Sequence, residues 1–244
     1  MNDLTKRVAL VTGGARGIGR AIALALAEAG AAVAVNYRSS GGEAEAVAEA
    51  VRRSGGRAAA FGADVSARMA VETMVRAIEG RLGPIDILVN NAGIAEARGL
   101  EITEEDFDRT MNVNLKSAFL CTQAVLQGMR ARRWGRIVNI SSIGARIGAG
   151  SVSIAYAAAK AGVEGLTRGY ALRLAAEGVT VNAVAPGLVD TEMGKPLIEA
   201  GVPARIPVGR AGTDAEIAQA VLLLVGNGYM TGQTVAVNGG ALFS

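Results

Sequence analysis

The sequence contains no histidine and a single cysteine, Cys121. Ser-His-Asp and Cys-His chemistry are therefore excluded, because in both the imidazole is the base that activates the nucleophile. Most zinc sites need imidazole or thiolate ligands, so no metal is expected. One cysteine cannot form a disulfide within the chain, and Cys121 lies on the apolar side of a predicted helix, where it is expected to pack in the core. Acid–base chemistry must fall to tyrosine, lysine or carboxylates.

Long hydrophobic runs are also missing. The longest apolar stretches have the length of a strand or are broken by arginine and glycine, so none is expected to span a membrane. Residues 1–6 carry no secretory hydrophobic region, and the expected location is the cytoplasm. The 25 basic and 22 acidic side chains are interleaved and give a net charge of +3. Because they form no basic stripe, nucleic-acid binding is not expected.

Half of the residues are hydrophobic, and the mean hydropathy is +0.31. A chain of this size and composition can bury a large core, and no linker interrupts it, so residues 1–244 are expected to form one domain. Strand and helix patterns alternate, which predicts an α/β fold with a doubly wound parallel sheet and helices on both faces. The expected strands are 7–12, 32–36, 58–62, 86–90, 136–140, 180–185 and 234–237, and the expected helices are 18–29, 43–54, 67–80, 104–129, 154–177 and 214–225.

A glycine-rich turn follows the first expected strand. The run Thr12-Gly13-Gly14-Ala15-Arg16-Gly17-Ile18-Gly19 leads directly into a helix that ends at Gly30. Residues without a Cβ atom let the backbone approach a pyrophosphate, which then lies at the positive end of the helix. The glycine spacing alone is equally compatible with a tight turn that binds nothing. A second strand at 32–36 completes a βαβ unit and favours a nucleotide site.

Tyr156 and Lys160 lie four residues apart in an expected helix, which places both side chains on one face. A nearby ammonium favours the phenolate and brings a tyrosine pKa that is ordinarily ~10 toward the working range of an acid or base. Lysine is scarce in a chain that otherwise uses arginine, which indicates that a compact ammonium is needed at position 160. Such pairs also occur on ordinary solvated helices, so the pair does not establish a catalytic site by itself.

Five elements occur together in one order along the chain. They are TGxxxGxG at Thr12–Gly19, the tetrad Asn90–Gly93, a serine after the strand at 136–140, YxxxK at Tyr156, and Pro186-Gly187 after a later strand. In this combination the sequence resembles the short-chain dehydrogenases/reductases over essentially its whole length. The resemblance implies a Rossmann-type fold and a nicotinamide-dependent oxidoreductase.

Within that family the chain looks most like bacterial 3-oxoacyl-[acyl-carrier-protein] reductases. This likeness implies NADPH-dependent reduction of a ketone to a secondary alcohol, with a 3-oxoacyl thioester as the expected substrate. Action on another carbonyl compound, a sugar or a small alcohol is the main alternative. A regulator that binds nucleotide without catalysis is a remote alternative, because the residues matched to catalysis are all present.

The resemblance assigns the chemistry to four residues. Tyr156 would protonate the carbonyl oxygen as hydride arrives, and Lys160 would lower the pKa of Tyr156 and hydrogen-bond the nicotinamide ribose. Ser142 would hydrogen-bond the substrate oxygen. Ser141 stays an alternative, because the spacing from Ser142 to Tyr156 is one residue longer than in many relatives. Asn114 matches the asparagine that holds a water beside the lysine.

The cofactor is expected to be NADP(H) for a reason of charge. A site selective for NAD usually has a carboxylate after the second strand, which would repel a 2′-phosphate. Here Arg38 and Ser39 follow that strand without an acid, and Arg16 in the glycine loop can reach the same phosphate. The alternative is that both arginines are ordinary solvated residues.

Further cofactor contacts follow from the resemblance alone. Asp64 is matched to a carboxylate that meets the adenine amino group, with Val65 against the ring. Val189 and Thr191 would meet the nicotinamide carboxamide, and residues 194–207 would form a substrate lid. The full set expected to bind the cofactor is Gly13, Ala15, Arg16, Gly17, Ile18, Gly19, Arg38, Ser39, Asp64, Val65, Asn91, Ala92, Gly93, Tyr156, Lys160, Pro186, Gly187, Val189 and Thr191.

An acyl carrier protein is a possible partner. Relatives that use it present basic residues beside the cleft, a role open here to Arg132 and Arg133. Glu177 stands where such relatives often have a second arginine, and Arg173 is a possible substitute.

Self-association is expected as well. The helices at 104–129 and 154–177 carry more apolar surface than one sheet face can cover, which predicts a homotetramer, or at least a dimer.

Overall fold

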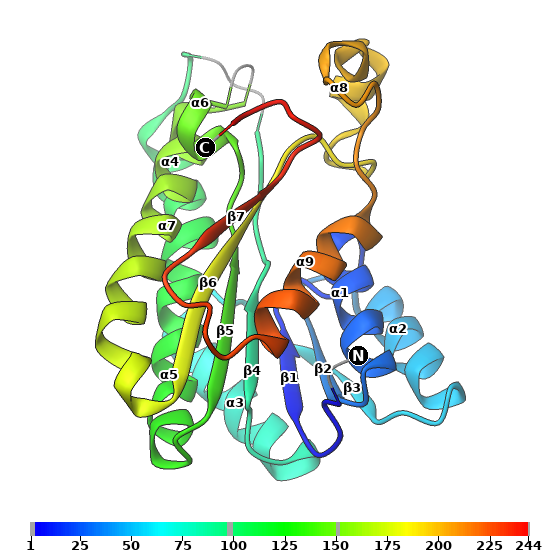
Figure 1. Cartoon of the computed structure of the whole chain (residues 1–244), viewed down its shortest axis with the longest axis vertical. Coiled ribbons are helices and arrows are strands. Elements are labelled where there is room, and N and C mark those ends of the chain that lie inside the picture. Colours follow the sequence, from blue (N-terminus) through cyan, green and yellow to red (C-terminus); the bar gives the residue numbers. More distant parts are fainter. Residues whose placement is uncertain (1–2, 97–99, 150–151, 244) are drawn as a thin grey trace.

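The computed structural model describes residues 3–96, 100–149 and 152–243. Seven parallel strands form one sheet in the order β3-β2-β1-β4-β5-β6-β7 (Figure 1). The strand order reverses direction between β1 and β4, as in Rossmann-type sheets. The predicted fold class is thereby confirmed. The strands are β1 (Val8–Val11), β2 (Ala32–Tyr37), β3 (Ala58–Gly62), β4 (Ile87–Asn90), β5 (Gly135–Ile140), β6 (Val179–Pro186) and β7 (Thr234–Val237).

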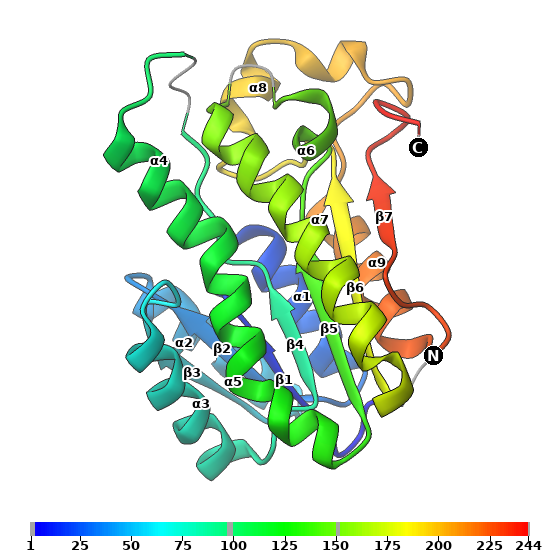
Figure 2. The ribbon, with the colours of Figure 1, turned by 90° about the vertical axis from the view of Figure 1, so that its left-hand side faces the viewer.

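Helices cover both faces of the sheet. In Figures 1 and 2, α1, α2 and α9 lie on one face, and α3, α5 and α7 lie on the other. The helices are α1 (Gly17–Glu28), α2 (Gly41–Arg53), α3 (Arg68–Leu82), α4 (Glu104–Met111), α5 (Ser117–Ala131), α6 (Gly144–Ile147), α7 (Ile154–Leu174), α8 (Lys195–Glu199) and α9 (Asp214–Gly226).

The central strands are mainly aliphatic because both of their faces are buried. In β1, Ala9 and Val11 belong to the core against α1, α2 and α9, whereas Val8 and Leu10 belong to the core against α3, α5 and α7. Strands covered on both faces show continuous hydrophobic runs instead of alternation. The buried sheet is a rigid support on which loops at the strand ends are held.

The expected helix at 104–129 is divided in the structure. A π-helical turn, η1 (Asn112–Lys116), separates α4 from α5, and α5 extends to Ala131. The Ser117 hydroxyl donates to the Val113 carbonyl within this turn. Wide turns of this type occur frequently at functional sites, and this one carries Asn114.

The described part of the chain contains no helix with both the length and the apolar character needed to cross a bilayer. The expected lid at 194–207 holds α8 and a short 3₁₀ turn, η3 (Val202–Arg205), which lie beyond the sheet at the top of Figure 1.

Candidate active site

The residues matched to catalysis and cofactor binding converge at the carboxyl end of the sheet, the upper end in Figure 2. The glycine loop follows β1, Arg38 follows β2, Asp64 follows β3, and Ser142 follows β5. Parallel strands all end at one edge of the sheet, so residues distant in sequence lie close together there.

The first turns of α7 place Tyr156 and Lys160. Helix α7 is capped by Ser153, whose hydroxyl accepts from the Tyr156 amide at 3.3 Å. Lys160 is 4% exposed, and its Nζ donates to the Ile140 carbonyl at 2.7 Å. Nζ lies 5.7 Å from the centre of the Tyr156 ring. The half-buried Tyr156 and the buried Lys160 thus lie together against the end of β5.

Burial is the main cause of the pKa shifts of Tyr156 and Lys160. It raises the pKa of Tyr156, and a hydrogen bond with Ser142 opposes that rise. Burial lowers the pKa of Lys160 to about 8. The sequence led us to expect a phenol pKa lowered by Lys160, but in the chain by itself burial raises this pKa, and the opposing contribution comes from Ser142.

The two consecutive serines after β5 point in different directions. Ser141 is buried, and its hydroxyl faces α7, 3.2 Å from the Lys160 carbonyl and 3.3 Å from Glu164 Oε1. Ser142 is partly exposed, accepts from the Gly144 amide at 3.0 Å, and hydrogen-bonds with Tyr156. This geometry favours Ser142 as the hydroxyl that would share a carbonyl oxygen with Tyr156.

Asn114 is held from both ends of its amide. Its Oδ1 accepts from the Ile94 amide at 2.7 Å, and its Nδ2 donates to the Ile94 carbonyl at 2.8 Å. A Cβ atom on Gly93 would lie 3.2 Å from Asn114 Oδ1 and 3.6 Å from Lys160 Nζ. Asn114 and Lys160 therefore flank Gly93, and the proposed water between asparagine and lysine stays a prediction.

The glycine loop is bound to the end of β4. The Thr12 hydroxyl accepts from the Asn91 and Ala92 amides at 2.9 and 3.0 Å. In return, Asn91 Nδ2 donates to the carbonyls of Thr12 and Gly13 at 2.9 and 3.1 Å. Asn91 therefore fixes the loop through its side chain, in addition to the cofactor contact expected from the sequence.

The loop fits an anionic dinucleotide. Gly13 and Gly17 have φ of 60° and 49°, a region that favours glycine. A Cβ atom on Gly19 would lie 2.3 Å from the Gly13 carbonyl oxygen, so only glycine permits this close packing. No side chain caps the first turn of α1, whose N-cap is Arg16. Its amide groups are thus available to a diphosphate. Within the same loop, Ala15 is buried and Ile18 is partly buried.

Asp64 is held in its ionised form. The Ser66 hydroxyl and amide donate to Asp64 Oδ1 at 2.6 and 2.9 Å. The Ser66 hydroxyl is the main cause of a lowered Asp64 pKa, and the charge of Arg38 contributes. An ionised carboxylate can accept from an amino group, as expected for adenine, while Val65 is buried next to it.

The arginines expected at the 2′-phosphate differ in direction. Arg38 and Ser39 are exposed after β2. Arg16 is paired with Glu192, with Arg16 Nη1 at 3.0 Å from Glu192 Oε2 and side chains 71% and 82% exposed. Arg16 thus extends toward the segment after β6, and its expected approach to the phosphate stays a prediction.

The segment after β6 passes over the glycine loop. The Gly187 amide donates to the Val237 carbonyl at 2.9 Å, which fixes the end of β6 after Pro186. Val189 is buried and bridges to Gly212. A Cβ atom on Gly17 would lie 3.4 Å from Thr191 Cγ2. Val189 and Thr191 therefore stand close to where a diphosphate on the glycine loop would lie.

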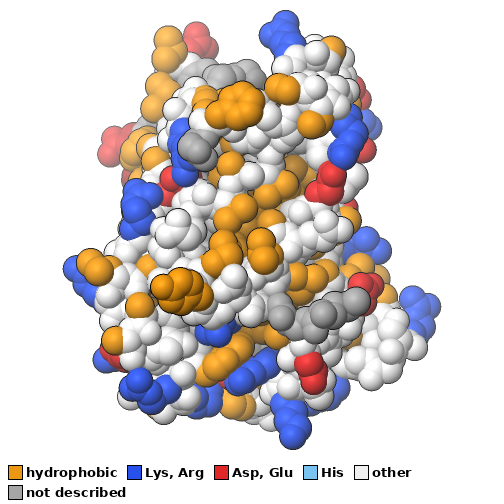
Figure 3. All heavy atoms as spheres, viewed as in Figure 1, with side chains coloured by type: hydrophobic (Ala, Val, Ile, Leu, Met, Phe, Trp, Pro, Cys, Tyr) orange, Lys and Arg blue, Asp and Glu red, His pale blue; other side chains and the backbone are white. Residues whose placement is uncertain are grey.

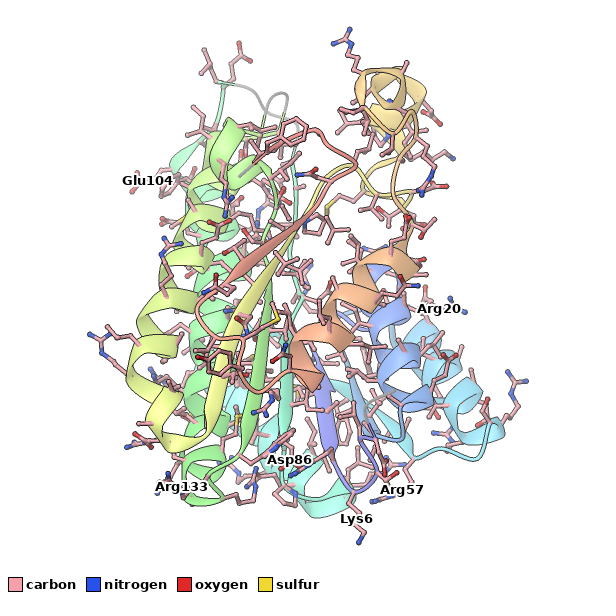
Figure 4. The ribbon with its side chains drawn as sticks, in the orientation of Figure 1. Lys6, Arg20, Arg57, Asp86, Glu104 and Arg133 are labelled. Carbon is pink, nitrogen blue, oxygen red and sulfur yellow. The ribbon has the colours of Figure 1, made fainter. Side chains whose placement is uncertain are left out.

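The sequence led us to expect Arg132 and Arg133 beside the cleft. In the structure they lie away from the cleft of their own chain. Arg132 donates to Asp86 Oδ1 at 3.3 Å and Arg133 donates to the Ala176 carbonyl at 3.0 Å. Figure 4 shows Arg133 and Asp86 at the lower end, far from Glu104 at the upper end. The reason is topological, because α5 returns the chain to the amino end of β5.

Several neighbours of the site were not identified from the sequence. The Ile140 carbonyl holds Lys160, Glu164 lies under Ser141, and Glu192 pairs with Arg16. Only Glu164 had a signal, because it lies one helical turn beyond Lys160 on the same helix. The described residues include no group of three or more His, Cys, Asp or Glu placed to hold a metal ion.

The model of the short chain dehydrogenase family matches residues 7–201. The chain belongs to this family. It is therefore an oxidoreductase that acts on CH–OH and C=O groups, with a nicotinamide cofactor.

Curated relatives in the family match over nearly the whole chain. The 3-oxoacyl-[acyl-carrier-protein] reductase of Pseudomonas aeruginosa is 46% identical, with 99% of this chain and 100% of the relative covered. Proteins of the same name from Staphylococcus epidermidis and Synechocystis are 44% and 42% identical; the alignments cover 95% and 98% of this chain and 97% and 98% of the relatives.

Proposed function

We propose that the chain reduces 3-oxoacyl thioesters to 3-hydroxyacyl thioesters with NADPH. The observation that carries this proposal is the grouping of Ser142, Tyr156 and Lys160 in a chain similar end to end to reductases of that name. We further propose that residues 1–244 act as one nucleotide-binding domain, and a cytoplasmic location stays a prediction.

The chain's own residues supply the proton and position the carbonyl. A bound nicotinamide would supply the hydride. The hydroxyls of Ser142 and Tyr156 hydrogen-bond each other, so a carbonyl oxygen placed between them would receive two hydrogen bonds that strengthen as negative charge develops. Tyr156, which like any tyrosine is protonated at neutral pH and whose pKa is raised further by burial, would then give its proton to that oxygen.

Lys160 and Asn114 would restore the proton. Lys160, with a pKa of about 8, is poised to exchange a proton near neutrality. Asn114 flanks Gly93 beside Lys160 and is rigidly held by Ile94. A water bound there would connect the buried ammonium to solvent and allow turnover.

The charge near β2 supports NADPH over NADH. Arg38 and Ser39 are exposed at the end of β2, where they would bind a 2′-phosphate. Asp64, at the end of the neighbouring strand β3, is already engaged by Ser66 and by the charge of Arg38.

Docking of an acyl carrier protein is a further part of the proposal. Arg133 lies at the end of the sheet opposite Tyr156, together with Lys6 and Arg57 (Figure 4). Arg130 is paired with Glu177, which neutralises part of this end. An acidic carrier bound there would lie at the far end of the sheet from the cleft of the same chain, so this part of the proposal requires a second copy that brings its own cleft beside Arg133.

The decisive experiment measures oxidation of NADPH with acetoacetyl thioesters and with a panel of ketones that lack a thioester. We expect the thioesters to give the highest kcat/KM, and NADPH to be preferred to NADH. A higher kcat/KM for a simple ketone, or for alcohol oxidation, would refute the substrate. A preference for NADH would refute the charge argument independently.

A further inference from the structure

Glu164 is a buried carboxylate to which the proposed chemistry gives no role. It lies on α7, one turn beyond Lys160, and is 6% exposed. A buried carboxylate is unfavourable unless it is paired and hydrogen-bonded, so its partners show what it is attached to.

The partners of Glu164 lie on both sides of Ser142 in the chain. The Ser141 hydroxyl lies 3.3 Å from Glu164 Oε1, and Arg146 Nε lies 3.5 Å from Glu164 Oε2. A third partner, Arg168, lies on α7 itself at 3.8 Å. Two of the three contacts therefore join α7, which carries Tyr156, to the segment that carries Ser142.

The segment from Ser141 to Ile147 depends on such anchors. Its backbone is tied to β6 at Ser141 and Ile143, whose amides donate to the Val184 and Pro186 carbonyls. Beyond Ile143 the segment forms α6, only four residues long, which is too short to be stable by itself. The ion pair of Arg146 with Glu164 attaches this short helix to α7.

We propose that Glu164 is a positioning residue, which holds Ser141 and Arg146 against α7 and thereby keeps the Ser142 hydroxyl beside Tyr156. The proposal rests on the proposed use of Ser142 and Tyr156, but not on which carbonyl compound is reduced. A displacement of about 1 Å between reacting groups can cost a large factor in rate, so a positioning role has a kinetic signature.

The test uses Glu164→Gln, which keeps the shape of the side chain and removes the charge that binds Arg146. We expect kcat to fall about tenfold or more, while KM for NADPH changes less than about twofold, because the glycine loop is untouched. Arg146→Gln should give the same pattern. The double variant should be no slower than the slower single variant, because both changes break one contact.

Arg168→Gln is the matched control. Arg168 also faces Glu164, but its side chain is 61% exposed and it belongs to α7, so its loss should leave kcat within about twofold. A kcat near that of the wild type in folded Glu164→Gln overturns the proposal. An equal loss of kcat in Arg168→Gln also overturns it. So does a Glu164→Gln variant that loses thermal stability but keeps its kcat.

Two precautions keep the result decisive. If Glu164→Gln does not fold, Arg146→Gln decides alone, because Arg146 is partly exposed. All variants are compared on the carbonyl compound that the wild-type protein reduces fastest. If the wild-type protein does not reduce 3-oxoacyl thioesters, the proposed function is refuted. The positioning role of Glu164 is then still tested on the compound that the protein does reduce.

Discussion

Lys160 keeps a charged side chain almost out of contact with water. Its pKa falls from 10.5 to about 8, so between these values the unfolded chain binds a proton that the folded chain has released. Stability rises with pH wherever the unfolded state binds more protons. We expect the free energy of unfolding to gain roughly 3 kcal/mol from this group as pH rises across that window.

Urea denaturation of wild type and Lys160→Met at a series of pH values isolates this contribution. The rise should be present in the wild type and absent in the variant. Tyr156 acts in the opposite sense at higher pH, because burial raises its pKa and the folded chain then retains a proton that the unfolded chain loses. If the free energies of unfolding of the two proteins changed with pH in parallel, a lowered Lys160 pKa would be contradicted.

Tyr156→Phe removes the proton donor and keeps the ring. We expect turnover to fall by ~10²-fold or more with cofactor affinity nearly unchanged. Ser142→Ala should also lower kcat strongly, while Ser141→Ala, which removes a hydroxyl that faces α7, should cost less. Steady-state kinetics and a fluorescence titration with NADPH measure both effects. Turnover of Tyr156→Phe within tenfold of wild type would disprove the assignment.

Arg38→Asp tests the cofactor. The new carboxylate would repel a 2′-phosphate and accept from a ribose hydroxyl, so KM for NADPH should rise strongly while that for NADH changes less. Ser142 and Tyr156 are unchanged, which makes kcat at saturating cofactor the internal control. An equal rise for both cofactors would indicate general damage to the site.

The sequence predicted which residues form the candidate site better than it predicted the contacts that those residues make. The order of motifs predicted that Ser142, Tyr156 and Lys160 meet at one end of the sheet, and the structure brings them together there. It did not decide between Ser141 and Ser142, because side-chain direction after a strand depends on how the chain turns. Glu192 was not foreseen, since pairing across 176 residues leaves no local pattern.

At the scale of elements, the glycine loop depends on the absence of side chains. Gly19→Ala would place a Cβ atom 2.3 Å from the Gly13 carbonyl oxygen and 2.5 Å from Asn91 Nδ2, so the loop must shift. We expect a loss of ~1–3 kcal/mol in stability together with weaker binding of NADPH. Urea denaturation and a binding titration measure the two effects.

Gly80→Ala is the matched control within α3. A Cβ atom there meets nothing within 4 Å, so this change should raise stability by ~0.5–1 kcal/mol and leave NADPH binding unchanged. If both alanine variants behaved alike, close packing would not be the reason for glycine at position 19.

Element types were predictable, but element boundaries were less so. Aliphatic runs predicted all seven strands, because strands covered on both faces need them. The π-helical turn at Asn112–Lys116 was missed, since helical periodicity is nearly the same on both sides of one widened turn. The short helix α8 was also missed, because five residues show no periodic pattern.

At the scale of the whole molecule, two faces carry exposed apolar side chains. On α7, Leu172 is 83% exposed and a Cβ atom on Gly165 would meet nothing within 4 Å. Figure 3 shows a second group of hydrophobic side chains across β7 and α9, where Leu223 is exposed. Soluble monomers seldom expose large apolar patches, so we expect each face to pair with a second copy.

Two such faces predict a homotetramer, and one alone would give a dimer. Sedimentation at micromolar concentration should show a mass above that of the 24.8 kDa chain. Leu172→Glu should reduce the assembly to a smaller species, because it places a charge on the α7 face, and Met69→Glu, on the exposed surface of α3, serves as the control. A monomeric wild-type protein would contradict the prediction.

The pairing of Arg16 with Glu192 has a consequence for how ionic strength affects the protein. The pair joins the glycine loop to the segment after β6, and both side chains are largely exposed. Such pairs contribute at most ~1 kcal/mol and weaken as ions screen them, over a Debye length of about 8 Å at physiological salt. Added salt should therefore loosen this bridge and weaken the attraction of Arg38 for a 2′-phosphate in parallel. NADPH should therefore dissociate faster as salt rises, and the expected preference for NADPH over NADH should become smaller.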